Sequence, residues 1–571
     1  MMIRRFLPFF LGISGLLAIG FSLPRNFLEP ALHYSGYYFI LVAFFLWILF
    51  ILKLSYHQFR SFITSHYPAV LLSTGLMCLI FFSHPPSFKI LADEANLVGV
   101  SMAMHENKTA SLPVQGLALD YAVFNPDYKL DKRPLLFPFF ISLVHSIAGY
   151  SPYNGYVVNF ILGVSILFMT YLLVSSLFSK FYGTLGILIL SSYPIFIIWV
   201  TSSGFDMLNL FLMVFLFLAL YYYLYNPSHD HAILFYLSLV LLVQCRYESL
   251  VFVLILLFLI PHMVKNKLIF RHGVISYIIP LLLLPVIWQR RLFANSLEPV
   301  RVGHGLFESA GQLFDIANLG ANLSKNIFVI SGMDSRFGFL PMISIMAVLG
   351  WYLLIKQCCL EFSSIDKRIK LFSLTGVVFT LSLFFIHSLY FWGNYAGPTS
   401  NRFALVFLPL LIIATIFFLN QTFENPGNNT KVVIILLAIV QFLYFKPVAE
   451  KQWILKGLSL THEYSKTSSC LSSNYDATSD NLLIISDLPS LYFIHGVGSV
   501  DFQYANQNTD KIKFFHQAYY DHIIVLQRCT LKDNQPGKQN RLNDKFQMTQ
   551  VGRINISPEF FIKISEVKRM L

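Results

Sequence analysis

The sequence predicts a polytopic α-helical membrane protein with a small α/β domain near its C-terminal end. Of its 571 residues, 56% are hydrophobic and only 12% are charged. Soluble chains carry about 25% charged residues, so a soluble core cannot account for this composition. Apolar runs of about 17 to 25 residues recur along most of the chain, and this length crosses a bilayer as a helix. Residues 447–571 differ from the rest because they are polar.

The apolar runs predict about thirteen membrane helices. They cover 6–23, 36–54, 67–84, 153–176, 183–200, 206–225, 231–246, 248–264, 273–289, 338–355, 370–390, 402–419 and 431–446. The first run has no clear small-residue cleavage site, so we expect it to remain as a helix rather than a signal peptide. A further apolar piece, 134–149, is short and contains two prolines and a histidine.

The Lys and Arg residues predict the orientation. If the N-terminus is cytoplasmic and 134–149 does not cross, the basic loops around Lys180, 265–271 and 356–370 all face the cytoplasm, as the positive-inside rule requires. If 134–149 crosses, the same loops lie outside and the rule fails. We therefore expect 134–149 to form a re-entrant or juxtamembrane helix on the outer face, covered by protein or a wet cavity.

Four parts follow from this topology. We expect three N-terminal helices in 1–84, an extracytoplasmic loop in 85–152, a membrane core in 153–446 with an outer loop at 290–337, and a soluble domain in 447–571. In that last part, strand-like runs alternate with a helix-like run, which indicates an α/β domain outside the membrane. The net charge of +12 is explained by the cytoplasmic loops rather than by nucleic-acid binding.

Asp93 and Glu94 form an acidic pair in "ILADEANLVG", at the start of the first large outer loop. Taken alone, this pair is explained equally well by the start of a helix, where the helix dipole favours carboxylates. The apolar residues between Ala95 and Met104 then predict an amphipathic helix.

Further ionisable residues fall on the same predicted face. They are Lys132 and Arg133 in "DKRPLLFPFF", Asp206 in "SSGFDMLN", Arg246 and Glu248 in "QCRYESL", and Arg402 in "TSNRFALV". All of them except Arg402 have a simple alternative: interfacial snorkelling or headgroup binding for the two cations of 132–133, a helix cap for Asp206, and a mutual ion pair for Arg246 with Glu248. Their gathering at one membrane surface favours a functional site.

In chain order, these motifs resemble those of the GT-C glycosyltransferases of the protein-mannosyltransferase and aminoarabinose-transferase type. The acidic pair is followed by "KRPLLFP", which is similar to a basic-Pro-Leu motif of that family. The stretch "AGYSPYNGYVVNFILG", which contains Asn159, and the later stretches "CRYESL" and "NRFALVFLPLL" resemble further family segments. Two features depart from the family pattern: three helices precede the acidic pair, and Arg133 replaces the first proline of the basic motif.

The resemblance implies a hexosyl or pentosyl transferase of the inner (plasma) membrane and cell envelope. It would move a sugar from a polyprenyl-phosphate-linked donor to an extracytoplasmic lipid, glycan or protein, with inversion at the anomeric carbon. Asp93 would be the general base, Glu94 would orient it or contact the acceptor, and Asp206 would hold the acceptor, a basic partner or a divalent ion. Residues expected to bind the donor phosphate are Lys132, Arg133, Arg246 and Arg402.

The resemblance implies that no cofactor is required. It does not decide whether a divalent Mg or Mn ion takes part, and it assigns no metal ligands. Three rival classes remain at this point, and one of them is a non-catalytic assembly protein in which the outer tail is the working part. A glycan ligase or polymerase would use basic and His residues of a large outer loop, such as His304 in 290–337. A lipid-linked-sugar transporter would place ionisable groups and broken helices near the middle of the membrane. In the glycosyltransferase, loop 290–337 is expected to close over the site as a lid.

Overall fold

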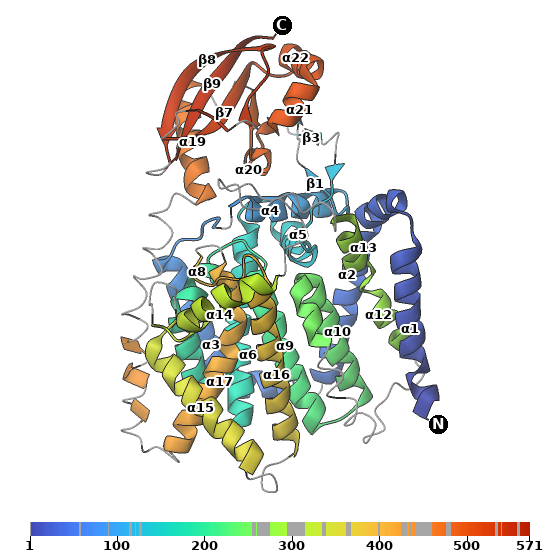
Figure 1. Cartoon of the computed structure of the whole chain (residues 1–571), viewed down its shortest axis with the longest axis vertical. Helices are drawn as coiled ribbons and strands as arrows, with labels where there is room; N and C mark the ends of the chain where they lie inside the picture. Colours follow the sequence, from blue (N-terminus) through green and yellow to red (C-terminus); the bar gives the residue numbers. More distant parts are fainter. Residues whose placement is uncertain are drawn as a thin grey trace.

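A computed structural model shows a bundle of helices that carries a smaller domain on one end, with α4 (Leu91–Glu106) and α5 (Leu136–Ala148) between the two (Figure 1). We call this the site end of the bundle. The described residues are 2–55, 59–89, 91–113, 117–119, 122–124, 128–253, 259, 274–293, 315–333, 339–360, 367–397, 400–423, 427, 431–432, 435–437, 439–440, 443, 459–475, 481–531, 535–537, 540–556 and 560–570.

The bundle is built from long helices that run between its two ends and from shorter helices that cover only part of that length (Figure 1). They are α1 (Met2–Ser22), α2 (Arg25–Ser55), α3 (Phe59–Ser83), α6 (Asn154–Leu177), α7 (Lys180–Ser192), α8 (Pro194–Val200), α9 (Asp206–Tyr225), α10 (His229–Cys245), α12 (Val274–Leu281), α13 (Leu284–Phe293), α14 (Ile316–Ile330), α15 (Pro341–Leu360), α16 (Lys367–Leu389) and α17 (Leu408–Thr422). Two 3-10 helices, η1 (Tyr247–Phe252) and η4 (Asn401–Phe407), lie between them in the chain.

Within the described part of the chain, six helices are long and apolar enough to cross a membrane, or seven when α7 and α8 are taken as one bent span. The predicted class, a multi-pass helical membrane protein, is therefore confirmed. The count of thirteen stays a prediction, because most of 254–273 and of 424–458 lies outside the described residues.

Two predicted spans are broken. The run 183–200 forms α7 and α8, which meet at an angle of 72°. The break falls at Tyr193, whose backbone is extended, because Pro194 lacks an N–H and disfavours a helical residue before it. The run 273–289 likewise forms α12 and α13 instead of one helix, and Pro280 lies near the end of α12.

Close packing in the bundle depends on small residues. A Cβ added at Gly163 of α6 would lie 2.6 Å from the Met77 side chain of α3 and 2.7 Å from that of Val200 of α8. Only glycine therefore allows the three helices to approach this closely, as is typical of membrane helix interfaces.

Helix α4 differs from the amphipathic surface helix that we expected. Its residues from Leu97 to Met104 are buried, and it packs against α5, the strand β1 (Leu112–Pro113) and the tail helix α20 (Pro489–Phe493). The domain at the C-terminal end covers the face that the sequence left without a partner. Helix α5 has 13 residues, about 20 Å of helix, so it is too short to cross a bilayer core of about 30 Å.

Between α4 and α5, the chain forms two short antiparallel pairs. Strand β1 pairs with β4 (Tyr128–Lys129), and β2 (Leu117–Leu119) pairs with β3 (Ala122–Phe124). Of the outer loop 290–337, the described part includes helix α14, which packs on α16. Residues 294–314, which contain His304, lie outside the described residues, so the expected lid is not described.

Residues 459–570 form a five-stranded mixed sheet with helices. The elements are α19 (Leu460–Asn474), β5 (Leu482–Ser486), α20 (Pro489–Phe493), β6 (Gly498–Val500), α21 (Phe502–Gln507), α22 (Thr509–Ala518), β7 (His522–Thr530), β8 (Phe546–Asn555) and β9 (Phe560–Met570). The strand order is β6-β5-β7-β9-β8, with β6, β5 and β7 parallel and the last two antiparallel. Alternate residues of β5 and β7 face opposite sides, so one face packs on α21 and α22 while the other joins the hydrophobic core of the bundle.

Polar contacts between described residues hold this sheet domain on the site end. Ser490 of α20 donates a hydrogen bond to Oδ1 of Asn96 in α4 at 2.7 Å. The Tyr150 hydroxyl donates to the backbone oxygen of Ile494 at 2.7 Å, and the backbone N–H of Phe88 donates to the Thr461 hydroxyl at 2.8 Å. The domain therefore rests directly on α4, the helix that begins with the acidic pair.

Candidate active site

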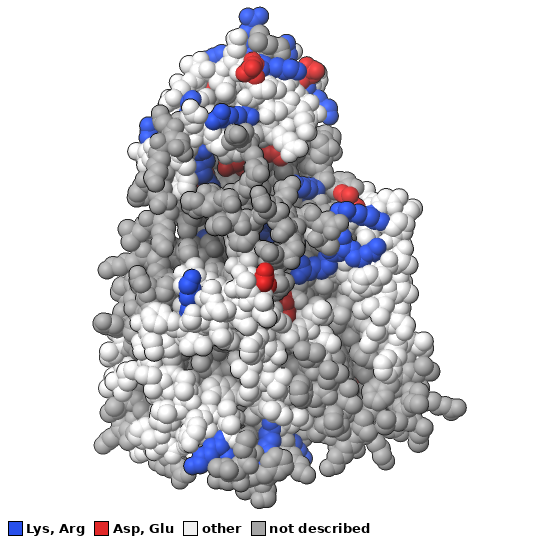
Figure 2. Space-filling model, in the orientation of Figure 1, with Lys and Arg blue, Asp and Glu red and all other residues white. Residues whose placement is uncertain are grey.

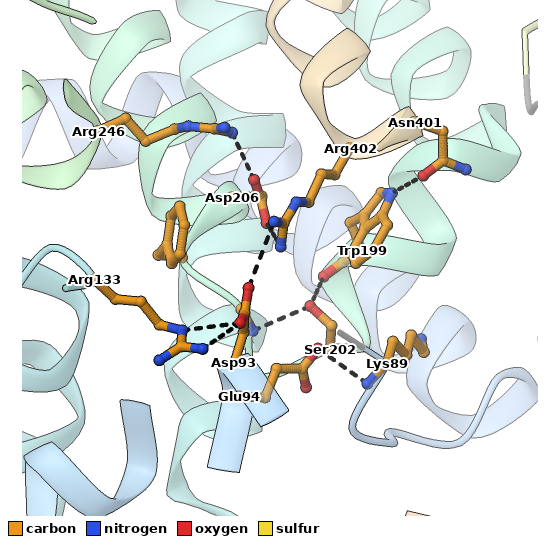
Figure 3. Close-up of polar contacts among 12 residues, drawn as sticks. Lys89, Asp93, Glu94, Arg133, Trp199, Ser202, Asp206, Arg246, Asn401 and Arg402 are labelled. Atoms are coloured by element: carbon orange, nitrogen blue, oxygen red, sulfur yellow. Dashed lines mark hydrogen bonds and ion pairs between the residues drawn. The ribbon is translucent and has the colours of Figure 1, made fainter. Parts of the chain in front are cut away.

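Seven charged residues from five segments of the chain meet at the site end of the bundle. We call them the charge cluster: Asp93, Asp131, Arg133, Asp206, Arg246, Glu248 and Arg402. Figure 3 shows how five of its members, labelled with their neighbours, point toward one another from the ends of α4, α9, α10 and η4. They meet because α9 begins where α10 ends: α9 runs away from the site end and α10 returns to it.

The Asp206–Arg246 pair is the most buried part of the cluster. Arg246 donates to Oδ1 of Asp206 at 2.7 Å, and the two side chains are 6% and 1% exposed. Arg246 also lies 3.4 Å from Glu248 and stacks over the Phe403 ring at 4.7 Å. The ion pair between Arg246 and Glu248 that we considered as an alternative is thus present, but the shorter contact of Arg246 is with Asp206.

Arg133 connects Asp93 to a residue that we did not predict. Its Nε donates to Oδ1 of Asp93 at 2.9 Å, and its NH1 donates to Oδ1 of Asp131 at 2.7 Å. The backbone around it is fixed as well, since Gln289 of α13 donates to the carbonyl oxygens of Asp131 and Arg133, each at 2.7 Å. Arg133 is therefore held between two carboxylates before any ligand arrives.

Arg402 joins the two halves of the cluster. One of its terminal nitrogens lies 3.5 Å from Oδ2 of Asp93 and the other 3.8 Å from Oδ2 of Asp206. The side chain is only 8% exposed, yet its Nε and NH1 lack a hydrogen-bond partner among the described residues, as does Oδ2 of Asp206. Arg402 is placed by η4, whose first residue Asn401 accepts a hydrogen bond from Trp199 at 3.1 Å.

Asp93 is the most exposed carboxylate of the cluster, with 28% of its side chain accessible. Burial by itself raises the pKa of this carboxyl, but Arg133 and Arg402 beside it, with a contribution from Lys132, hold the pKa below its usual value. Lys132 is exposed, and no ion pair of its side chain is found among the residues that the structure describes. Asp93 and Lys132, together with Glu248, which is 26% exposed, are thus accessible to a ligand.

Glu94 and Asn159 lie beside the charge cluster and not in it. Glu94 is fully buried, and its two oxygens accept backbone N–H groups, from Lys89 at 3.0 Å and from Ser203 at 2.8 Å. The Asn159 side chain donates to the carbonyl oxygens of Ser202 at 2.6 Å and Gly204 at 3.1 Å. Both residues therefore hold the loop that precedes Asp206.

The cluster offers few ligands to a metal ion. In the described part of the chain, no group of three or more His, Cys, Asp and Glu residues is arranged to hold one. The oxygens of Asp93, Asp131 and Asp206 that have short contacts are engaged by guanidinium groups.

Two residues of the site were not predicted. Asp131 directly precedes the Lys132–Arg133 pair, and the argument that selected those cations applies equally to it. Lys89 lies four residues before Asp93. The only feature of the sequence that could have singled it out is its positive charge within an otherwise uncharged stretch. Its burial could not be read from the sequence, because it depends on a contact with α8.

The resemblance to GT-C glycosyltransferases seen in the motif order is confirmed by a family model and by the folds of solved structures. Residues 132–288 match the family model described as dolichyl-phosphate-mannose-protein mannosyltransferase. The match contains the basic pair, Asp206, Arg246 and Glu248, but it begins after Asp93 and ends before Arg402.

Among solved structures, the chain is similar to ArnT from Cupriavidus metallidurans in the apo state, with a TM-score of 0.50 at 10% identity over 88% of this chain and 98% of that one. The same protein bound to undecaprenyl phosphate gives a TM-score of 0.48 at 11% identity over 87% and 97%. The archaeal oligosaccharyltransferase AglB from Archaeoglobus fulgidus, in complex with an inhibitory peptide and a dolichol-phosphate, gives 0.45 at 11% identity over 82% and 70%. A search among curated proteins gave no match to this chain.

Proposed function

We propose that this chain is an integral-membrane glycosyltransferase that moves a sugar from a polyprenyl-phosphate-linked donor to an extracytoplasmic lipid, glycan or protein. One observation carries the proposal: Arg402 lies between Asp93 and Asp206 with two buried nitrogens that lack hydrogen-bond partners in the described part of the chain. Buried polar groups are nearly always paired, so such donors call for an acceptor. A phosphate oxygen fits the planar fork of a guanidinium.

The charge balance of the cluster gives Lys132 a role. The cluster has four carboxylates and three guanidiniums, which leaves it one negative charge when all seven groups are ionised. A phosphodiester brings another negative charge, and the leaving phosphate gains more as the bond to the sugar breaks. Arg133 is already held by two carboxylates, so its charge is not available to the phosphate. Lys132 is exposed and close enough to influence Asp93, so in this proposal it supplies the positive charge that the phosphate needs.

Asp93 acts as the general base in this proposal. Its lowered pKa keeps it ionised near neutral pH, and its partial exposure allows an acceptor hydroxyl to reach it. The acceptor oxygen gives its proton to Asp93 and forms a bond to the anomeric carbon. The bond from that carbon to the phosphate oxygen breaks, and its electron pair leaves with the polyprenyl phosphate. A single displacement of this kind inverts the anomeric carbon.

The position of the cluster suits a lipid-linked donor. Figure 2 shows Lys and Arg at the lower edge of the bundle and charged residues over its upper half, and the described residues on the face between them are uncharged. A polyprenyl tail stays in the hydrocarbon layer, so its phosphate lies at headgroup depth, where the site end would be. By the positive-inside rule we place the site end and the sheet domain on the outer face of the membrane.

In the proposed reaction, the guanidinium groups of the charge cluster balance the negative charge of the phosphate. Asp206 would otherwise be a candidate ligand of a divalent ion, but one of its oxygens already accepts a hydrogen bond from Arg246 at 2.7 Å. In this proposal Asp206 therefore holds Arg246 and Arg402 in place. Glu94 and Asn159 hold the loop before Asp206, as their contacts with its backbone indicate.

A lipid-linked-sugar transporter is the second candidate, because the break between α7 and α8 is a feature that transporters use. The ionisable groups favour the transferase, since they lie at the site end of the bundle and not beside a mid-membrane break. A transporter would move the donor without cleaving it, so the release of polyprenyl phosphate separates the two functions.

The test is transfer from radiolabelled polyprenyl-phosphate sugars by the full chain in lipid nanodiscs. We expect the wild type to release polyprenyl phosphate and the Asp93→Asn variant to do so about 100 to 10,000 times more slowly. Asp544→Asn, an exposed acid of the sheet domain, is the matched control and should keep full activity. Full activity in a folded Asp93→Asn variant would contradict the assignment of Asp93 as the general base. If the wild type releases polyprenyl phosphate from no donor, the proposal that this chain is an enzyme is wrong.

A further inference from the structure

A loop of five residues, 201–205, leads from α8 into Asp206 at the start of α9, and buried side chains hold it from both sides. Glu94 accepts the N–H of Ser203, and Asn159 donates to the carbonyl oxygens of Ser202 and Gly204. The backbone of this loop therefore cannot shift without breaking contacts to α4 and α6. Since Asp206 follows directly, the loop sets the position of that carboxylate.

Lys89 is the third side chain that holds this loop, and it is an unusual one. Its side chain is 1% exposed, although lysine is almost never fully buried unless it is paired. Its Nζ donates to the backbone oxygen of Ile198 at 2.6 Å and to the hydroxyl of Thr201. These acceptors lie at the C-terminal end of α8, where unpaired carbonyl groups attract a cation.

The backbone around Lys89 is pinned to several elements at once. The N–H of Ser87 donates to the oxygen of Thr201 at 3.1 Å, and that of Lys89 donates to Glu94 at 3.0 Å. The N–H of Phe88, between them, donates to Thr461 of the sheet domain at 2.8 Å. Three consecutive residues thus connect α4, the loop 201–205 and the sheet domain.

We propose that Lys89 is a positioning residue, which acts with Glu94 to set the place of Asp206 relative to Asp93. Asp93 directly precedes Glu94 in α4, and Asp206 follows Ser203 by three residues, so the Lys89–Glu94 pair ties together the two chain segments that carry these acids. Figure 3 shows the Lys89–Glu94 contact beside the charge cluster. Arg402 reaches the two acids only at 3.5 and 3.8 Å, so a small movement of either segment would release it.

The catalytic part of this inference depends on the proposed function, whereas the structural part does not. If Lys89 only stabilised the fold, its replacement would lower the amount of folded protein and leave the remaining molecules fully active. If it positions Asp206, the folded variant keeps its donor affinity but turns over slowly, because a misplacement of about 1 Å can cost about 100-fold in rate.

The test compares Lys89→Met with the wild type and with Lys545→Met, an exposed lysine of the sheet domain, in nanodiscs. Amide hydrogen exchange of the peptide 199–206 and of α4 is measured together with kcat and KM for donor transfer. We expect exchange at 199–206 to be at least tenfold faster in Lys89→Met, with kcat about 100-fold lower and KM changed less than about threefold. Glu94→Gln should change the same peptide, and the double variant should add little to either single variant.

Thr201→Val provides a milder variant in case Lys89→Met does not fold, since it removes one acceptor of Lys89 and no charge. It should change exchange and kcat in the same direction by a smaller factor. Unchanged exchange at 199–206 in both variants, or an unchanged kcat in an active chain, would overturn the inference. Faster exchange in a chain whose wild type transfers no sugar would instead reject the proposed function and leave the role of Lys89 in fixing the loop supported.

Discussion

The two ends of the helix bundle use the same kind of contact in different ways. At the end opposite the site, Lys53 of α2 and Asp230 of α10 form an ion pair at 2.8 Å, with side chains 57% and 30% exposed. At the site end, Arg246 and Asp206 lie at nearly the same distance, 2.7 Å, but are 6% and 1% exposed. Lys53 also lies over the Phe50 ring at 5.6 Å, but the buried Arg246 contacts a second acid as well as an aromatic ring.

The difference shows that the distance in an ion pair does not reveal what the pair does. An exposed pair is screened by water and salt and contributes little to stability. A buried pair has given up its hydration, so it is costly to form and more costly to break. The gathering of seven charged groups at the end of membrane helices therefore favours a functional role for this cluster.

The largest effect is expected at the buried pair. Arg246→Met leaves Asp206 without its closest partner, so the free energy of unfolding should fall by about 3 to 5 kcal/mol. Denaturant titration in mild detergent measures this loss. Adding Asp206→Leu removes the unpaired carboxylate and should recover a large part of it. A loss no larger than that at Lys53 would show that the buried charges are less dehydrated than their exposure indicates.

A second effect separates two adjacent cations. Arg133→Met leaves Asp93 and Asp131 without their shared partner and should lower the free energy of unfolding by about 2 kcal/mol. Lys132→Met should change stability by less than about 0.5 kcal/mol, yet raise KM for the donor if Lys132 binds its phosphate. The same titration, together with transfer kinetics, measures both. Equal stability losses in the two variants would contradict the pairing described for Arg133.

A third effect depends on pH. Burial lowers the pKa of Lys89 from 10.5 to about 7, although the charge of Glu94 opposes the change. Between these pH values the unfolded chain binds more protons than the folded chain, so wild-type stability should rise with pH across this window. The gain is about 1 kcal/mol for one pH unit within the window, and Lys89→Met should lack it. Parallel stability curves for the two proteins would rule out this titration.

The smallest effect is expected at the exposed pair. Lys53→Met should lower the free energy of unfolding by less than about 1 kcal/mol, and high salt should remove most of the difference. Asp230→Asn should behave in the same way, because either change removes the same screened contact. A salt-independent loss of several kcal/mol would mean that this end of the bundle also holds dehydrated charge.

Much of the architecture could be predicted from the sequence, because membrane helices have a strong local signal. The runs 206–225 and 370–390 correspond closely to α9 and α16, and 134–149 is the short helix α5. The breaks were harder to predict: Pro194 was visible, but a proline within an apolar run kinks some helices and ends others. The burial of α4 was missed because the covering surface comes from residues 489–494, almost 400 positions away in the chain.

The candidate site was predicted as a set of residues and not as a set of pairs. Topology placed Asp93, Arg133, Asp206, Arg246 and Arg402 at one end of the bundle, and the structure brings them into contact there. The sequence could not show that Arg402 reaches both Asp93 and Asp206. Contacts between segments of different helices depend on how those helices pack, and local patterns do not record this.

The acidic pair shows most clearly what each level decides. The sequence by itself determined that two carboxylates begin a helix at one end of a membrane bundle, because helix dipoles and hydrophobic length act locally. Only the tertiary structure decided that they differ: Asp93 faces the guanidinium groups of Arg133 and Arg402, while Glu94 is fully buried against the backbone of Lys89 and Ser203. Neighbours on a helix point about 100° apart, so each meets a different part of the fold.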